Sequence, residues 1–172
     1  MQYVFILGAG RSGTKIFRDC IGASKNVVAL PYDVGYVWMD GQNRPHDELL
    51  PADLSSKRIQ SIRKSIASLA KRASKGQSYD IIIEKSVPNT LRPAYLKKVF
   101  PDSKFIHIVR DGRDVVESAM RNWKTPSDKG YLLDKLRYFP FRNWSYALWY
   151  LINMIRRLSK DTQVLWLSLI HI

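Results

Sequence analysis

The sequence has little cysteine and no long apolar run. Its single cysteine, Cys20, excludes an internal disulfide and offers no metal-binding spacing. We expect it to be a buried helix residue in a protein of a reducing compartment. The longest apolar candidate, residues 146–155, is far shorter than the roughly 20 residues that cross a bilayer. No signal peptide precedes the first apolar run. These absences predict a soluble, cytoplasmic protein without a transmembrane segment.

Acidic residues are also scarce. Asp and Glu number 15 against 28 Lys and Arg, which gives a formal net charge of +13. Such an excess favours an anionic ligand, and nucleic acid is the first class to consider. No nucleic-acid-binding motif accompanies the charge, so we expect no nucleic-acid partner. The cations are then divided between solvated surface and a site for an anionic cofactor or substrate.

Apolar periodicity predicts strands alternating with helices in a single domain. The length of 172 residues and the 45% hydrophobic content suit one domain with a real core. Continuous apolar runs predict strands at 3–7, 79–83, 104–109 and 162–167, and residues 26–30 (NVVAL) form a further short apolar run. Helices are expected at 13–22, 55–75, 91–100, 115–122 and 144–158, and an irregular, substrate-facing loop at 31–49. This alternation favours an α/β fold whose central, mainly parallel sheet is covered on both faces.

A glycine-rich turn, GAGRSGTK at residues 8–15, follows the first strand. Its backbone N–H groups and the helix N-terminus predict an anion site. A Walker A loop ends in G-K-[ST], whereas here Thr14 precedes Lys15, which argues against an ATPase or kinase. The three glycines also satisfy the G-x-G-x-x-G spacing of dinucleotide folds. Two features argue against a dinucleotide-binding fold. Arg11 lies inside the turn, and Asp33, the acidic residue at the right distance, lies in the turn-rich stretch LPYDVGY.

A second motif, FIHIVRDGRDVVESAM at residues 105–120, comes at the end of a later strand. Arg110 ends the strand, and Ser118 lies eight residues further on the next helix. Such a pair is suited to a second, separate phosphate. Taken alone, the RDGRD turn has an alternative interpretation as a solvated turn with local salt bridges.

Together, the two motifs resemble the sulfotransferase family that uses 3′-phosphoadenosine 5′-phosphosulfate (PAPS). GAGRSGT resembles the family's 5′-phosphosulfate loop, and the stretch 84–120 resembles the one that leads through its 3′-phosphate motif. The resemblance implies a P-loop NTPase-like three-layer α/β sandwich. It also implies PAPS as co-substrate, no required metal, and transfer of a sulfuryl group to a hydroxyl or amine acceptor, with a saccharide among the candidates. The residues that it assigns to the donor are Arg11, Ser12, Gly13, Thr14, Lys15, Arg110 and Ser118.

The remaining requirement is a base for the acceptor's proton. Asp33 lies about where some members of the family carry a glutamate, and His46 is the second candidate; an Asx turn is the structural alternative for Asp33. Lys85 is expected to face the sulfate or the acceptor, unless it pairs with other charges around Glu84. We interpret His107 as a core histidine and assign Trp38, Trp144 and Trp149 to core packing.

Domains of this family are usually longer. We therefore expect residues 1–172 to be a single domain that lacks its C-terminal part, with 167–172 of non-native origin. Two alternative functions stay open at this stage. One is a P-loop small-molecule kinase with Glu84 or Asp111 on the metal side, and the other is a non-catalytic polyanion-binding module.

Overall fold

The computed structural model describes residues 1–39 and 47–123. The chain divides into two compact units, Met1–Val115 and Val116–Ile172, and each is described by itself. The expected helix 144–158, the expected strand 162–167, Trp144 and Trp149 all lie outside the described residues. A single domain over the whole chain stays a prediction.

Four parallel strands form the sheet of the first unit. They are β1 (Gln2–Leu7), β2 (Val27–Ala29), β3 (Ile81–Glu84) and β4 (Lys104–His107), in the order β2-β3-β1-β4. Phe5 of β1 pairs with Glu84 on one side and Phe105 on the other. The carboxyl end of β1 is therefore flanked by the ends of β3 and β4, where open α/β sheets bind ligands.

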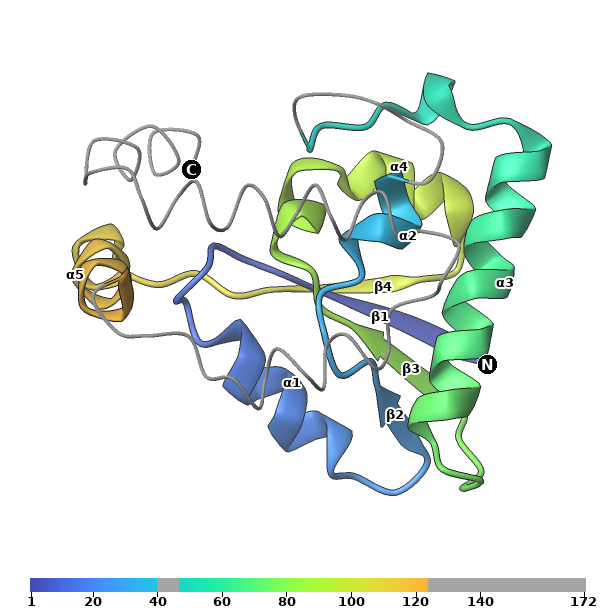
Figure 1. Ribbon diagram of the computed structural model, residues 1–172, viewed down its shortest axis with the longest axis horizontal. Coiled ribbons are helices and arrows are strands. Elements are labelled where there is room, and N and C mark those ends of the chain that lie inside the picture. Colours follow the sequence, from blue (N-terminus) through green and yellow to red (C-terminus); the bar gives the residue numbers. More distant parts are fainter. Residues whose placement is uncertain (40–46, 124–172) are drawn as a thin grey trace. The chain divides into compact units, whose positions relative to one another are not determined.

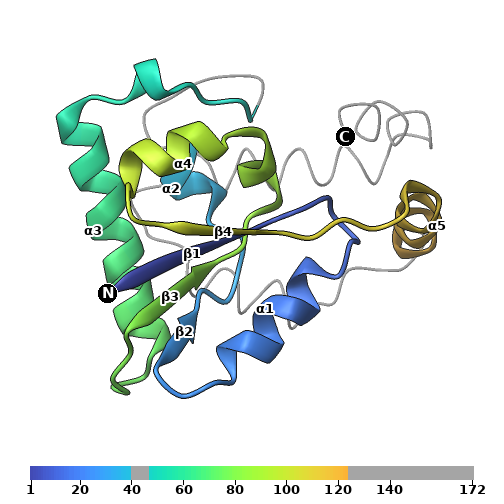
Figure 2. The ribbon, with the colours of Figure 1, turned by 180° about the vertical axis from the view of Figure 1, so that it is seen from behind.

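Helices of the first unit cover both faces of this sheet. They are α1 (Thr14–Gly22), α2 (Gly35–Met39), α3 (Ser56–Ala73) and α4 (Pro93–Val99), with short 3-10 helices η1 (Pro51–Asp53) and η2 (Val87–Leu91). Helix α5 (Gly112–Trp123) crosses the boundary into the second unit. In this strand order, the connection from β1 to β2 crosses the sheet in one direction. The connections from β2 to β3 and from β3 to β4 cross it in the opposite direction. Right-handed crossovers therefore place α1 on one face and α3 and α4 on the other, an arrangement that can be followed in Figure 1 and Figure 2.

Aromatic and aliphatic side chains fill the layer under α2, α3 and α4. The ring of Phe5 lies 5.8 Å from those of Trp38 and Phe100, and Trp38 has no exposed surface. Helix α3 adds the buried stripe Ile62, Ile66 and Ala70. Its N-cap, Ser55, accepts a hydrogen bond from the N–H of Arg58 at 3.2 Å. The α/β fold and the core position of Trp38 are confirmed.

Several local expectations are wrong. Cys20 is exposed, because α1 buries Thr14 and Arg18 and residue 20 lies on the far side of the helix from them. His107 is exposed because β4 is the outermost strand of the described sheet and has little cover. The expected loop 31–49 contains α2. The expected helix 91–100 is present as α4, and the 3-10 helix η2 precedes it. Within the described ranges, no helix is both long and apolar enough to cross a membrane.

Candidate functional site

The glycine-rich loop runs from the end of β1 to the first turn of α1. Gly8 has φ +147° and Gly13, the N-cap of α1, has φ +88°. Both values lie in the region that favours glycine. The N–H of Ser12 donates to the carbonyl of Ala9 at 3.2 Å and closes the turn. The first turn of α1 contains no acidic side chain, so the positive end of the helix dipole stays available to an anion.

The side chains of the glycine-rich loop differ in their burial. Ser12 and Thr14 are buried, whereas Arg11 and Lys15 are exposed. Arg11 itself has φ +70°, an unfavourable backbone for a residue with a Cβ. Strained backbone at an exposed arginine within a glycine-rich turn is a feature typical of functional sites.

Arg110 lies against this loop. Its Nη1 donates to the carbonyl oxygen of Arg11 at 3.2 Å, although 99 residues separate the two in sequence. Its Nη2 lies 3.4 Å from Oδ2 of Asp114, one turn further along the chain. The structure thus brings Arg110, which lies three residues after the end of β4, to the glycine-rich turn. Ser118 lies on α5 in the second unit.

The RDGRD turn also has local ion pairs. The backbone N–H of Arg113 donates to Oδ1 of Asp111 at 2.8 Å, and its guanidinium lies 2.9 Å from Oδ2. These hydrogen bonds hold the pKa of the Asp111 carboxyl below its ordinary value. The local pairing considered from the sequence is present, alongside the contact of Arg110 with the loop.

Asp33 and Lys85 form an ion pair beside the sheet. Lys85 Nζ lies 2.6 Å from Asp33 Oδ1. The lysine side chain is only 10% exposed, while 36% of the aspartate side chain remains open to solvent. Because β2 and β3 are neighbours, the residues that follow them meet at the carboxyl edge of the sheet. His46, the second candidate for the base, lies outside the described residues.

The segment that carries Asp33 is held from two sides. The N–H of Val34 donates to Ser86 Oγ at 2.9 Å, and Nη1 of the buried Arg18 donates to the carbonyl of Pro31 at 2.7 Å. One contact comes from the end of β3 and the other from α1. Asp33 therefore lies on a segment that is anchored to the end of β3 and to α1.

A buried carboxylate, Glu84, organises the region between these contacts. It accepts hydrogen bonds from the Ser86 hydroxyl, from Asn89 Nδ2 at 2.6 Å and from Trp38 Nε1 at 3.4 Å. Burial raises the pKa of Glu84, and its bond with Ser86 acts in the opposite direction. Because both oxygens are occupied by these donors inside the protein, Glu84 supports the site and does not face a substrate.

Thr90 links the same region to the glycine-rich loop. Its Oγ1 accepts from the N–H of Gly8 at 2.9 Å and donates to the carbonyl of Gly8 at 3.2 Å. Thr90 lies on η2, one residue after Asn89, which is bonded to Glu84. A chain of contacts therefore runs from the Asp33 segment through Ser86 and Glu84 to the first glycine of the loop.

Sequence reasoning missed four of these supporting residues: Arg18, Ser86, Asn89 and Thr90. Hydroxyl and amide side chains in a short turn carry no periodic signal. The sequence offered one weak signal. Residues 86–90, SVPNT, follow an apolar strand, and polar side chains that become buried there need hydrogen-bond partners.

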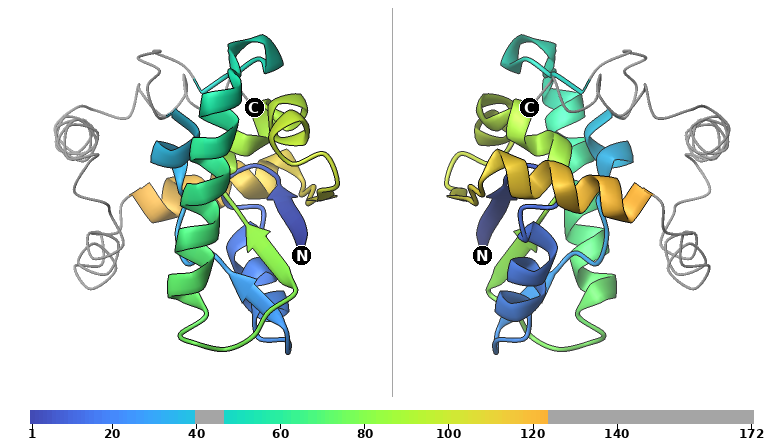
Figure 3. Two further views of the ribbon diagram at one scale, coloured as in Figure 1. Left: turned by 90° about the vertical axis from the view of Figure 1, so that its right-hand side faces the viewer. Right: turned by 90° about the vertical axis from the view of Figure 1, so that its left-hand side faces the viewer.

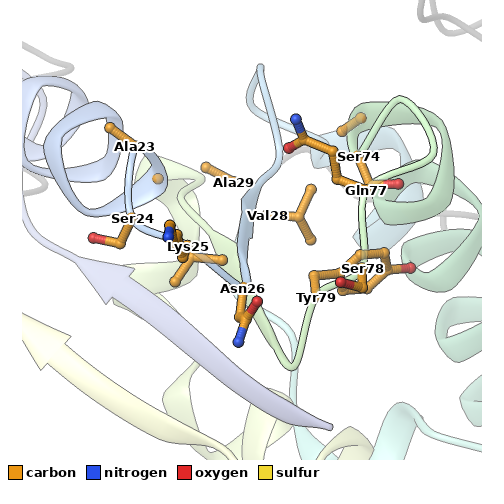
Figure 4. A pocket seen from close by; sticks show the side chains of 13 residues that line it. Ala23, Ser24, Lys25, Asn26, Val28, Ala29, Ser74, Gln77, Ser78 and Tyr79 are labelled. Carbon is orange, nitrogen blue, oxygen red and sulfur yellow. The ribbon is translucent and has the colours of Figure 1, made fainter.

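The rest of the described residues contain a pocket but no cluster of potential metal ligands. No group of three or more His, Cys, Asp or Glu within them could hold a metal ion. A pocket lies at the opposite end of the strands from the glycine-rich loop, beside the starts of β2 and β3. Figure 4 shows that polar side chains line it, among them Ser24, Lys25, Asn26 and Gln77. None of the predicted site residues contributes to it.

Comparison with known proteins identifies the family. The family model described as "Sulfotransferase family" matches residues 3–165, and the chain therefore belongs to the sulfotransferase family. No curated protein matches the sequence. Among solved structures, the chain is similar to the unliganded crystal structure of a sugar kinase from Janibacter sp. HTCC2649, with 15% identity and a TM-score of 0.36 over 86% of this chain and 76% of that one.

Proposed function

We propose that this protein transfers a sulfuryl group from PAPS to a hydroxyl or amine acceptor, with a saccharide among the candidates. The single observation that supports this proposal best is the contact between Arg110 and the carbonyl of Arg11. It joins Arg110 to the glycine-rich turn, so one extended ligand with two phosphate groups can contact both. Membership of the sulfotransferase family supports the reaction class.

In the proposed complex, the loop residues bind the phosphosulfate end of the donor. The backbone of Ser12, Gly13 and Thr14 donates hydrogen bonds, and the exposed cations of Arg11 and Lys15 neutralise the oxygens. Arg110 binds the 3′-phosphate, exchanging its weak pairing with Asp114 for a charge-assisted bond. Ser118 is the second 3′-phosphate ligand of the proposal.

The proposed reaction is an in-line displacement at sulfur. The acceptor oxygen or nitrogen forms a bond to sulfur, while the bond from sulfur to the bridging oxygen breaks and its electron pair stays on the 5′-phosphate. Arg11 and Lys15 stabilise the charge that develops on that phosphate. The acceptor's proton passes to the carboxylate of Asp33, which Lys85 holds in place at 2.6 Å.

This chemistry does not call for a metal. A sulfuryl group carries less charge than a terminal phosphoryl group, so fixed cations and loop dipoles can supply the neutralisation. The cytoplasmic location suggested by the single cysteine stays a prediction, as does the role of His46.

Nucleotide-dependent thermal stabilisation tests the proposal. A ligand at one hundred times its Kd stabilises a protein by about 2.7 kcal/mol, which raises Tm by several degrees. We expect 3′-phosphoadenosine 5′-phosphate to raise Tm in this way and ATP with Mg²⁺ to have little effect. The reverse pattern would overturn the proposal in favour of the kinase alternative.

A further inference from the structure

Helix α3 carries charge of one sign only. Its 18 residues, SKRIQSIRKSIASLAKRA, include six Lys and Arg and no Asp or Glu. Natural surfaces usually intersperse both signs, and large fields of a single sign are typical of surfaces that attract an oppositely charged partner. The helix lies along the outside of the first unit, as the left view of Figure 3 shows.

Three lysines of α3 form a straight row that points away from the core. Lys57, Lys64 and Lys71 are exposed and recur every seven residues. Seven residues of helix advance about 10.5 Å and return almost to the same face, so the row extends over about 21 Å. The row lies opposite the buried stripe of Ile62 and Ile66, and the exposed Gln60 and Ser68 separate its cations.

These three lysines differ from the other cations of the helix. Arg58 donates to Tyr95 Oη and to the carbonyl of Trp38, and Arg63 donates to the carbonyl of Val99. Within residues 1–39 and 47–123, the side chains of Lys57, Lys64 and Lys71 have no ion pair or hydrogen bond. They form a row of cations that the described part of the chain does not neutralise.

We infer that the row of Lys57, Lys64 and Lys71 binds a linear acidic polysaccharide. This inference rests on the proposed function, because the bound chain would be the acceptor or sulfated product held outside the catalytic site. A polymer with an anionic group on each repeat can contact all three lysines along the helix. A small acceptor could contact only one.

The composition of the face separates this partner from other polyanions. Single-stranded nucleic acid binds by stacking its bases on aromatic side chains, and α3 has no aromatic residue. A helix that binds a membrane surface inserts an apolar face, whereas the apolar face of α3 is buried in the protein. The exposed face offers cations, hydroxyls and an amide, which suit sulfate, carboxylate and sugar hydroxyl groups.

The test compares two triple variants with equal charge change. In one, Lys57, Lys64 and Lys71 are changed to alanine. In the matched control, the exposed Lys25, Lys98 and Lys104, which lie on other elements, are changed to alanine. Fluorescence polarisation with a labelled heparin oligosaccharide, over a range of salt concentrations, gives the affinity and its salt dependence. Circular dichroism verifies that both variants are folded.

The α3 variant should lose at least about tenfold in heparin affinity, and the slope of log K against log salt should fall by about 2 to 3. The control should retain the wild-type affinity within about twofold and most of its salt slope. Equal losses in the two variants would overturn the inference and indicate a diffuse charge effect. A loss confined to duplex DNA or phosphatidylserine vesicles would overturn the choice of polysaccharide.

A parallel measurement separates this inference from the proposed function. The α3 variant should keep the full thermal shift with 3′-phosphoadenosine 5′-phosphate, because the row is distinct from the residues assigned to the nucleotide. If wild-type protein shows no such shift, the proposed function fails. If the shift is present and the α3 variant still binds heparin normally, the inference alone fails.

Discussion

Thr90 is the residue whose side chain fixes the start of the glycine-rich loop. Its hydroxyl both accepts from and donates to the backbone of Gly8. Changing Thr90 to Val preserves the shape but removes both hydrogen bonds, which should lower the free energy of unfolding by about 1–3 kcal/mol. Nucleotide affinity should fall several-fold because the loop loses its anchor.

Urea unfolding and titration with 3′-phosphoadenosine 5′-phosphate measure these two effects. The control is Thr90→Ser, which retains the hydroxyl and should keep most of both properties. If the valine and serine variants behaved alike, the hydroxyl would have no role in holding the loop.

Glu84 provides a pH-dependent prediction at the same scale. Burial raises its pKa in the folded protein above the ordinary value of 4.5, so the folded state retains a proton that the unfolded chain releases. The contribution of Glu84 to stability is therefore complete below pH 4.5 and declines as pH rises through the folded pKa.

As pH increases from 4 to 7, the free energy of unfolding of the wild type should therefore fall relative to that of Glu84→Gln, because glutamine does not titrate. Urea denaturation at several pH values measures it. A difference that stays constant, or shifts in favour of the wild type, would show that Glu84 is not held towards its protonated form.

At the scale of elements, the close approach of the loop to Ile108, the residue that follows β4, determines which position of the loop requires glycine. A Cβ on Gly8 would lie 2.6 Å from the carbonyl oxygen of Ile108 and 3.0 Å from Thr14 Cγ2, at φ +147°. Gly8→Ala should therefore cost about 1–3 kcal/mol of stability.

Gly10 is the matched control, since a Cβ there meets nothing within 4 Å. Gly10→Ala should change stability by no more than about 0.5 kcal/mol. Differential scanning calorimetry or urea unfolding compares the two variants. Equal destabilisation would mean that loop flexibility, and not the contact with Ile108, sets the requirement for glycine.

Sequence patterns predicted the elements that carry strong periodicity. The strand before the loop, helix α3 and the later strand–helix unit all appear near their expected positions, because buried apolar runs leave few alternatives. The patterns failed for short or irregular pieces. Helix α2 has only five residues, and its position depends on Trp38 entering the core, a tertiary contact without local signal.

The candidate site was only partly accessible to sequence reasoning. Motif spacing indicated Arg11 and Arg110, which the structure brings into contact. The Asp33–Lys85 pair joins residues 52 positions apart and follows from the adjacency of β2 and β3, which the sequence did not specify. Supporting contacts such as that of Thr90 with Gly8 depend on individual hydroxyl positions, so they required the structure.

At the scale of the whole molecule, our proposals assign two separate roles to the cations that give the chain its net charge of +13. Cations at the carboxyl edge of the sheet would bind the nucleotide, and the row on α3 would bind the polymer. Salt should weaken both, but the polymer more steeply, because it contacts a longer series of charges.

The central claim is that Arg110 and the glycine-rich loop bind one nucleotide with a 3′-phosphate. Isothermal titration calorimetry of wild type and Arg110→Ala, each with 3′-phosphoadenosine 5′-phosphate and with adenosine 5′-phosphate, tests it directly. We predict that the wild type prefers the bisphosphate by tenfold or more, about 1.4 kcal/mol, and that Arg110→Ala abolishes this preference while binding of the monophosphate is retained. An undiminished preference in the variant, or an equal loss of both nucleotides, would contradict the claim.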